Sequence, residues 1–224
     1  MMAAAAAPIT TEEAAAAVAT ASASIAESGL VSASAGNVSV KLGDEIVITP
    51  RRGRLDRIDP DSCRRVRIGD GAEADESADW MPSSETPLHL AVYRASDAGA
   101  VVHTHSTYAT ALSTVADELP PIHYLLAAFG GPVRVAPYAT FGSEELAENV
   151  RVALKDRKAA LLRNHGAVVH AATLDRAVDL AHQLEWMSRV YLISRGAGEP
   201  ALLDQAELDH VSERAETLRY GMGA

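Results

Sequence analysis

The feature that most constrains the fold is a pair of short β-rich runs in the segment NVSVKLGDEIVITP, residues 37–50. In the first run apolar residues alternate with polar ones, and Gly43-Asp44 separates it from the second run, 46–49. Two such runs joined by a short Gly-Asp turn predict an antiparallel β-hairpin. Because strands joined by a tight turn run in opposite directions, the sheet that contains this hairpin is not uniformly parallel.

Helical patterns alternate with further strand patterns along the chain. Thr10 and Glu13 have the spacing of a capping box, which predicts a helix over 11–28. Further helices are predicted from Glu85, over 144–155 behind Ser143, from Thr173 to about Arg195, and after Asp204. Further strands are predicted in GAVVHTHS, VRVAPYATFG and ALLRNHGAVVHA, the last as strand, turn and strand. The sequence therefore predicts an α/β fold with a central mixed or antiparallel sheet flanked by helices.

Size and composition are those of an ordinary globular protein. We predict one domain over 9–224 behind a flexible tail at 1–8, because 224 residues with 48% hydrophobic residues suffice for one core.

A formal net charge of −10 argues against nucleic acid and anionic membrane surfaces as partners. The alanine-rich start lacks the basic segment of a signal peptide, and no apolar run reaches the roughly 20 residues of a membrane helix. We therefore expect a cytoplasmic protein.

The single cysteine, Cys63, leaves His, Asp and Glu to build any metal site. In VVHTHS, His103 and His105 are two residues apart, and on a strand such residues point to the same face. Both imidazoles can then converge on one metal ion. A bare His-x-His pair is only moderately specific, so two unrelated histidines remain an equally weighted alternative.

A third histidine and one glutamate are further candidates. His165 precedes Gly166 at a predicted strand break, where a turn can direct a side chain into a cleft. Glu85 follows two serines at a helix start, where it is either a general acid/base or a charge that caps the helix. His89 and His182 fall within helical patterns, which favours packing or surface roles for them.

Seven short motifs occur in one order along the chain: AGNVSV, ITP, PSSE, VVHTHS, PIHY, APYATFG and NHG. Together they resemble the class II aldolase and adducin family, and within it the aldolases of fuculose phosphate, over about residues 11–221. The resemblance implies a three-layer α/β/α subunit in a homotetramer, with an active site at each subunit interface.

The resemblance also implies roles for individual residues. His103, His105 and His165 match the ligands of Zn²⁺, and Glu85 matches a general acid/base that can also reach the metal. The other matched positions are phosphate-binding Gly36, Asn37, Ser83 and Ser84, the catalytic Tyr124 from a neighbouring subunit and Tyr220, and Phe141 in the wall of the aldehyde pocket.

The sequence departs from the pattern of the family in two places. Arg51-Arg52 stand where Thr-Gly completes the phosphate loop, and Thr217 stands where an aromatic residue is expected. In one interpretation the two arginines are solvated and pair with Asp56 or Asp59. In the other, one guanidinium contacts the substrate phosphate in place of the lost donors.

The implied reaction is the reversible cleavage of a ketose 1-phosphate, such as L-fuculose 1-phosphate. Its products are dihydroxyacetone phosphate and an aldehyde such as L-lactaldehyde. Pentulose-phosphate 4-epimerases of the family usually carry Asp at the position of Glu85, so the glutamate favours the aldolase. A dehydratase of the family and an adducin-like interaction module without catalysis are the remaining alternatives.

Overall fold

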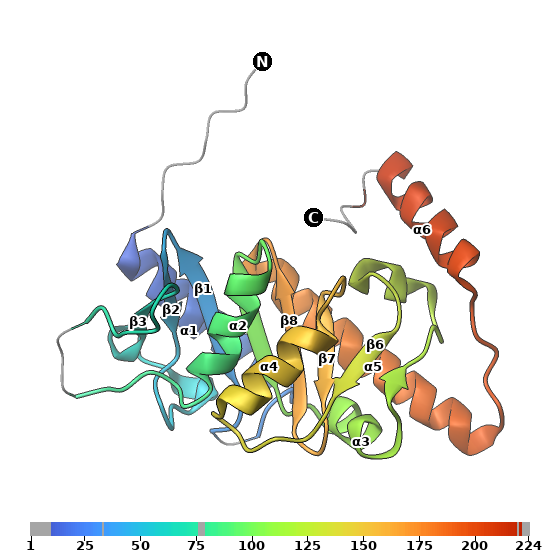
Figure 1. The fold of residues 1–224 in the computed structure, drawn as a ribbon, viewed down its shortest axis with the longest axis horizontal. Coiled ribbons are helices and arrows are strands. Elements are labelled where there is room, and N and C mark those ends of the chain that lie inside the picture. Colours follow the sequence, from blue (N-terminus) through green and yellow to red (C-terminus); the bar gives the residue numbers. More distant parts are fainter. Residues whose placement is uncertain (1–9, 33, 76–78, 219, 221–224) are drawn as a thin grey trace.

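The computed structural model describes residues 10–32, 34–75, 79–218 and 220. The tail predicted at 1–8 lies outside these residues. In the described part of the chain eight strands form one sheet in the order β3-β2-β1-β4-β8-β7-β6-β5 (Figure 1). The strands are β1 (Asn37–Leu42), β2 (Glu45–Ile48), β3 (Arg64–Arg67), β4 (Ala100–Thr104), β5 (Glu118–Leu119), β6 (Val133–Ala136), β7 (Ala159–Leu162) and β8 (Gly166–Ala171).

The sheet is mixed, which confirms that prediction. All neighbouring strands pair antiparallel except β6 and β7, which are parallel. The predicted hairpin is β1 and β2, with Leu42 paired opposite Glu45 across the turn. Gly43 in this turn has a φ of 65°, a left-handed conformation that glycine adopts without a steric penalty.

Helices flank the sheet, and their caps follow the predicted signals. At the start of α1, Glu13 N donates to Thr10 Oγ1 and Thr10 N donates to the Glu13 carboxylate, which completes the capping box. Asp204 and Glu207 form the same reciprocal bonds before α6. The helices are α1 (Thr11–Glu27), α2 (Thr86–Ala95), α3 (Thr107–Val115), α4 (Glu144–Ala153), α5 (Leu174–Ala197) and α6 (Gln205–Leu218), with 3₁₀ turns η1 (Leu55–Arg57), η2 (Pro60–Ser62) and η3 (Tyr124–Phe129).

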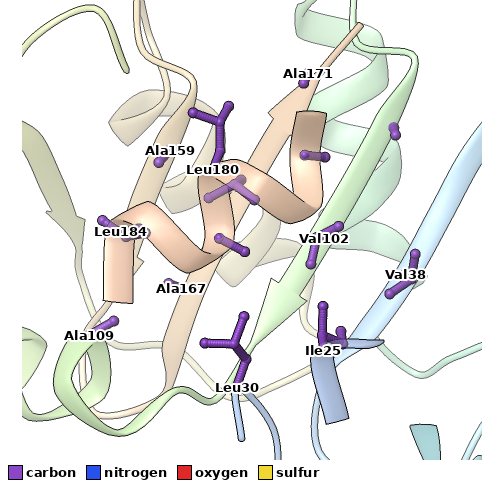
Figure 2. Close-up of a cluster of buried hydrophobic side chains, with 14 of the residues drawn as sticks. Ile25, Leu30, Val38, Val102, Ala109, Ala159, Ala167, Ala171, Leu180 and Leu184 are labelled. Atoms are coloured by element: carbon purple, nitrogen blue, oxygen red, sulfur yellow. The ribbon is translucent and has the colours of Figure 1, made fainter. Parts of the chain in front are cut away.

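The two faces of the sheet carry separate hydrophobic clusters. On β4, Ala100 and Val102 pack toward α1 and α5, whereas Val101 packs toward α2 and α4. Figure 2 shows the first cluster, in which Val102 lies near Ile25 and Leu180. Because side chains alternate along a strand, His103 faces the same side as Val101, toward α2.

Among the described residues, no helix is both long and apolar enough to cross a membrane. The longest, α5, has 24 residues and carries several charged side chains. It packs against the sheet instead, through Ala177, Leu180 and Leu184.

Candidate metal and active site

His103 occupies a central position in the sheet. It pairs with Asn37 on β1 and with Val168 on β8, and its side chain is fully buried. His103 Nδ1 donates a hydrogen bond of 2.9 Å to the backbone oxygen of Ala167. Since that carbonyl can only accept, this bond orients the ring so that Nε2 faces the site.

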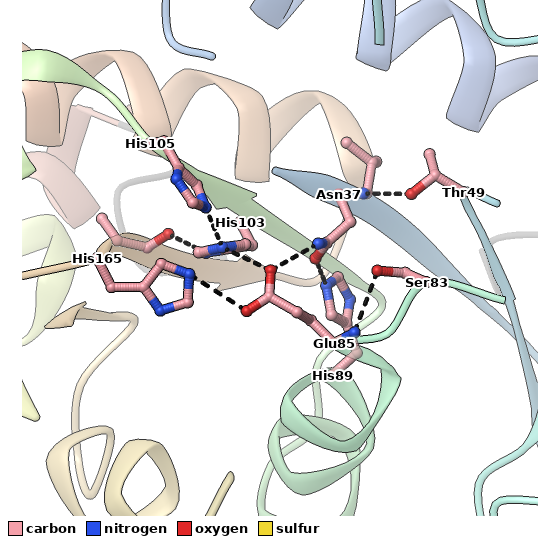
Figure 3. Close-up of polar contacts among 10 residues, drawn as sticks. Asn37, Thr49, Ser83, Glu85, His89, His103, His105 and His165 are labelled. Atoms are coloured by element: carbon pink, nitrogen blue, oxygen red, sulfur yellow. Dashed lines mark hydrogen bonds and ion pairs between the residues drawn. The ribbon is translucent and has the colours of Figure 1, made fainter. Parts of the chain in front are cut away.

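Two further imidazoles meet His103 from separate segments (Figure 3). His105 lies one residue beyond the end of β4, and its Nε2 is 3.0 Å from His103 Nε2. His165 lies in the turn between β7 and β8, where Asn164 has a φ of 56°. The centroids of the three rings are 4.7–4.9 Å apart. The structure thus brings together all three histidines that the motifs had singled out.

Gly166 allows the start of β8 to lie close to the end of β4. A Cβ atom at Gly166 would lie 2.1 Å from the backbone oxygen of Thr104, far inside van der Waals contact. Only glycine therefore lets the start of β8 lie so close to the end of β4. This contact holds His165 beside His105.

We expect Gly166→Ala to lower the free energy of unfolding by about 3 kcal/mol or more, because the added methyl group meets backbone rather than a flexible side chain. Gly196→Ala is the matched control, since its Cβ meets nothing within 4 Å and the position is helical. The control should be neutral or stabilising by up to about 1 kcal/mol. Urea unfolding measures both, and equal midpoints for Gly166→Ala and the parent would contradict this packing argument.

Glu85 completes the cluster and does not cap its helix. It occupies the position before α2, yet its side chain makes no cap hydrogen bond, so the capping interpretation is wrong. Instead Oε2 lies 3.0 Å from His103 Nε2, and Oε1 lies 3.3 Å from His165 Nε2. The side chain is 8% exposed, so this carboxylate is directed into the protein.

A chain of buried hydrogen bonds on the side of Asn37 orients the Glu85 carboxylate. Asn37 Nδ2 donates to Glu85 Oε2 at 3.0 Å, and His89 Nε2 donates to Asn37 Oδ1 at 2.5 Å. His89 Nδ1 accepts from Ser39 Oγ at 2.7 Å, and Ser39 also bonds Tyr93. Sequence reasoning assigned His89 to packing or the surface and missed this role. Its position four residues after Glu85, on the same helix face, was the available signal.

The electrostatics of the cluster favour neutral rings at His105 and His165 beside an ionised Glu85. Burial, followed by the charge of His103, lowers the pKa of His105 to about 3 and that of His165 to about 4. Burial is the largest single effect and opposes ionisation of Glu85. The charges of His103 and His165, together with the hydrogen bonds from His103 and Asn37, outweigh it and hold the pKa of Glu85 below its usual value. Burial is also the largest single effect on His103 and disfavours its charged form. The charge of Glu85, together with the hydrogen bonds to Glu85 and to the oxygen of Ala167, outweighs burial and raises the pKa of His103.

The four side chains fit a divalent metal ion. One ligand atom from each of Glu85, His103, His105 and His165 lies within 4.8 Å of the others. Glu85 Oε1 is buried without a hydrogen-bond partner among the described residues, although His165 lies within ion-pair distance. An unpaired buried carboxylate oxygen beside imidazole nitrogens is the donor set that binds Zn²⁺ and similar ions.

The predicted phosphate-binding residues lie on the segments around the cluster. A Cβ at Gly36 would lie 2.8 Å from the backbone oxygen of His103, so Gly36 packs directly on β4. Ser83 Oγ accepts from the backbone N–H of Glu85, and Ser84 is partly buried against Gly142. The amide of Asn37 is engaged by Glu85 and His89 rather than free.

Arg51 and Arg52 lie in a loop beside the same serines. Arg51 N donates to the oxygen of Met81, and Ser83 N donates to the oxygen of Thr49, which joins the two segments. Both arginine side chains are exposed, and Arg52 has a φ of 61°.

One interpretation paired these arginines with Asp56 or Asp59, and among the described residues neither pair is present. Asp56 pairs instead with Arg54 at 3.0 Å and with Arg57 at 3.5 Å. The carboxylate of Asp59 accepts the backbone N–H of Asp61, as a turn residue does.

The aromatic residues predicted for the site are exposed in this single chain. Tyr124 is 50% exposed, Phe141 is 65% exposed and Tyr220 is 73% exposed. The ring of Tyr124 contacts His123, with centroids 4.4 Å apart, instead of the histidine cluster. Phe141 precedes Gly142, whose Cβ would lie 2.6 Å from the oxygen of Ser84, so its loop borders the predicted phosphate site.

Comparison with known proteins gives one consistent answer. Residues 16–192 match the model of the Class II Aldolase and Adducin N-terminal domain family. The chain is 40% identical over 197 residues to an L-fuculose phosphate aldolase of Escherichia coli O6:H1, covering 87% of this chain and 89% of that protein. It is 36% identical over 202 residues to a 5-methylthioribulose-1-phosphate/5-deoxyribulose-1-phosphate aldolase of Rhodospirillum rubrum, covering 88% and 87%.

A solved structure of an L-fuculose 1-phosphate aldolase superposes on this fold with a TM-score of 0.86 at 32% identity, covering 91% of this chain and 96% of that one. The sheet, the order of the motifs and the cluster of three histidines with one glutamate accord with this match. The chain belongs to the class II aldolase and adducin family.

Proposed function

We propose that this protein is a zinc-dependent aldehyde-lyase that reversibly cleaves a ketose 1-phosphate to dihydroxyacetone phosphate and an aldehyde. L-Fuculose 1-phosphate, with L-lactaldehyde as the second product, is the leading substrate because of the 40% identical relative. The observation that carries the proposal is the convergence of three imidazoles and a buried carboxylate within 4.8 Å.

In this proposal His103, His105 and His165 hold the metal ion. A bound divalent cation polarises a ketose carbonyl and stabilises negative charge that develops on its oxygen. The low pKa values of His105 and His165 keep both rings neutral, the form in which imidazole is a ligand. The bond from His103 Nδ1 to Ala167 keeps its Nε2 directed at the site.

Glu85 moves the proton at carbon. Its carboxylate is ionised and held by Asn37, so it can accept a proton from dihydroxyacetone phosphate in the condensation direction. In the cleavage direction the protonated carboxyl returns that proton to the enediolate carbon. Tyr124 and Tyr220 are proposed to serve the aldehyde end, with Tyr124 exchanging the proton on the aldehyde oxygen.

A homotetramer with active sites between subunits is part of the proposal, and the exposed aromatic residues support a subunit interface. Tyr124, Phe141 and Tyr220 are at least half exposed in the single chain, and Trp186 beside His123 is 47% exposed. Large aromatic side chains are enriched at protein interfaces. A neighbouring subunit that covers them would bring Tyr124 to the cluster of another chain. Sedimentation or mass photometry of the purified protein measures this directly.

The phosphate is proposed to bind between Gly36, Asn37, Ser83 and Ser84, next to the loop of Arg51 and Arg52. We expect Arg51→Ala or Arg52→Ala to raise KM for the phosphorylated ketose roughly ten- to hundredfold, because a charge-assisted hydrogen bond contributes about 1.5–3 kcal/mol. The value of kcat should change less, since the phosphate is remote from the breaking bond.

Kinetics with phosphorylated and unphosphorylated ketoses measure this effect. The rise in KM should shrink for the unphosphorylated substrate, which never makes the contact. Arg54→Ala is the matched control, because Arg54 pairs with Asp56 in the same loop. An unchanged KM in both variants would leave the arginines as solvated residues.

A panel of ketose 1-phosphates with product identification tests the function itself. Formation of dihydroxyacetone phosphate and an aldehyde supports the lyase, whereas a 4-epimer or a dehydrated product would identify the epimerase or dehydratase alternative. 5-Deoxyribulose 1-phosphate belongs in the panel, since relatives at 34% and 36% identity are named for it. Absence of turnover together with absence of bound metal would favour a non-catalytic module.

A further inference from the structure

A cavity lies away from the cluster and is lined by the carboxyl-terminal ends of α2 and α4, the end of β8 and the start of α5. Its volume is about 440 Å³, which is within the range of small-molecule sites. Among the described residues, its lining includes no member of the histidine and glutamate cluster. Any ligand held here would therefore be separate from the proposed substrate.

The lining of the cavity is basic, although the whole chain carries a formal charge of −10. Lys158 pairs with Asp97 at 3.7 Å, and Arg151 pairs with Glu148 at 2.6 Å. The five cationic side chains of the lining are Arg151, Lys155, Arg157, Lys158 and Arg176, against the carboxylates of Asp97 and Asp156. A local excess of positive charge in a concave site favours an anionic ligand.

The guanidinium of Arg157 hydrogen-bonds neutral backbone oxygens rather than carboxylates. Its Nε donates to the oxygen of Pro132 and one terminal nitrogen donates to the oxygen of Asp156, so neither bond meets a charged acceptor. Burial, followed by repulsion from Arg134, lowers the pKa of Arg157. An anion bound in the cavity would stabilise the charged guanidinium against both its burial and the repulsion from Arg134.

Arg176 offers a hydrogen-bond donor that nothing in the described structure uses. Its Nε is buried and has no hydrogen-bond partner among the described residues. Arg176 also lies in the first turn of α5, where the helix dipole disfavours a cation. An anionic oxygen at this position would accept from Nε and offset the dipole.

His170 offers the opposite group, a buried acceptor. Its side chain is 3% exposed, and Nε2 donates to the backbone oxygen of Arg157 at 3.1 Å. Burial lowers the pKa of His170, which keeps the ring neutral. With the proton on Nε2, Nδ1 is a lone-pair acceptor, and it is buried without a partner among the described residues.

We propose that this cavity binds a small organic anion that carries a hydroxyl group next to its charged group, such as a phosphorylated or carboxylated polyol. The anionic oxygens bind Arg176 and Arg157, and the hydroxyl donates to His170 Nδ1. Phe129 and Leu180 supply an apolar wall for the carbon chain. The site would give the protein a ligand that binds at the end of β8 opposite the catalytic cluster.

Isothermal titration calorimetry of the full chain tests the proposal with four probes: glycerol phosphate, glycerate, inorganic phosphate and glycerol. We expect saturable binding of one or both hydroxylated anions, weaker binding of inorganic phosphate and none of glycerol. Tighter binding of glycerol phosphate would indicate a phosphorylated ligand, and tighter binding of glycerate would indicate a carboxylated one. If glycerol bound as well as the anions, or neither hydroxylated anion showed saturable binding, the proposal would fail.

Two variants assign the binding to this cavity. Arg176→Gln should weaken binding of the preferred anion roughly ten- to hundredfold, because it removes a charge-assisted donor. Arg195→Gln is the matched control on the same helix, since Arg195 pairs with Glu199 outside the cavity. His170→Phe should abolish the preference for glycerol phosphate over inorganic phosphate.

Turnover of the ketose phosphate separates the cavity from the catalytic cluster. Arg176→Gln should retain the turnover of the parent protein while losing the calorimetric binding. Equal affinity in the parent and Arg176→Gln, with equal inhibition of turnover by glycerol phosphate, would assign the binding to the catalytic cluster and overturn the proposal. Because Arg176 lies partly at the surface, this variant tests the site even if His170→Phe fails to fold.

Discussion

Replacing Glu85 with glutamine is expected to lower kcat for retro-aldol cleavage by roughly a hundred- to ten-thousandfold, the range attributed to a general acid/base. Glutamine preserves the size of the side chain and its bond to Asn37, but it cannot accept a proton from carbon. The metal content and the free energy of unfolding should change little. The defect should therefore appear in kcat, with a smaller change in KM.

Two measurements on the same variant separate proton transfer from a structural effect. Exchange of the dihydroxyacetone phosphate proton with solvent deuterium should slow in parallel with cleavage, because both need the same base. Glu85→Asp keeps the charge but withdraws it by one methylene group, so it should recover part of the exchange. If Glu85→Gln exchanged that proton at the parent rate, another residue would be the base.

Replacing His103 with alanine is expected to lower metal affinity at least about a hundredfold and to reduce turnover to background. It removes one of the three proposed nitrogen ligands and leaves the oxygen of Ala167 without its donor. Atomic emission of the purified protein measures bound metal, and addition of Zn²⁺ to chelator-treated parent protein should restore turnover. The chelated His103→Ala protein should not recover.

His182→Ala is the matched control for this experiment. His182 lies on α5 with its Nε2 3.5 Å from Ser28 Oγ, outside the cluster. It should keep parent metal content and turnover. Full metal content in His103→Ala would place the metal site elsewhere in the molecule.

Much of the local structure follows from short-range sequence signals. The capping boxes of Thr10 with Glu13 and of Asp204 with Glu207 form as their spacing predicts, because each involves residues three apart on one helix turn. The hairpin from β1 to β2 is also local, because a short turn connects its two strands. These features need no information about the rest of the fold.

Only part of the candidate site could be predicted from such short-range sequence signals. The motifs singled out the three histidines and Glu85, but local reasoning left a capping role open for Glu85 and assigned His89 to packing or the surface. Both depend on what α2 packs against, namely Asn37 and His103 on two neighbouring strands. A helix start looks alike in sequence whether its first carboxylate turns back to the backbone or inward.

The sequence by itself determined most of the helices and strands, that the sheet is not uniformly parallel, and which histidines to consider. Only the tertiary structure decided that β4 lies between β1 and β8, so that His103 meets Asn37 on one side and the turn of His165 on the other. The same holds for the cavity around Arg176 and His170, whose walls come from four distant segments. The physical reason is that strand order and helix packing bring together residues far apart in the chain, and no local spacing encodes those contacts.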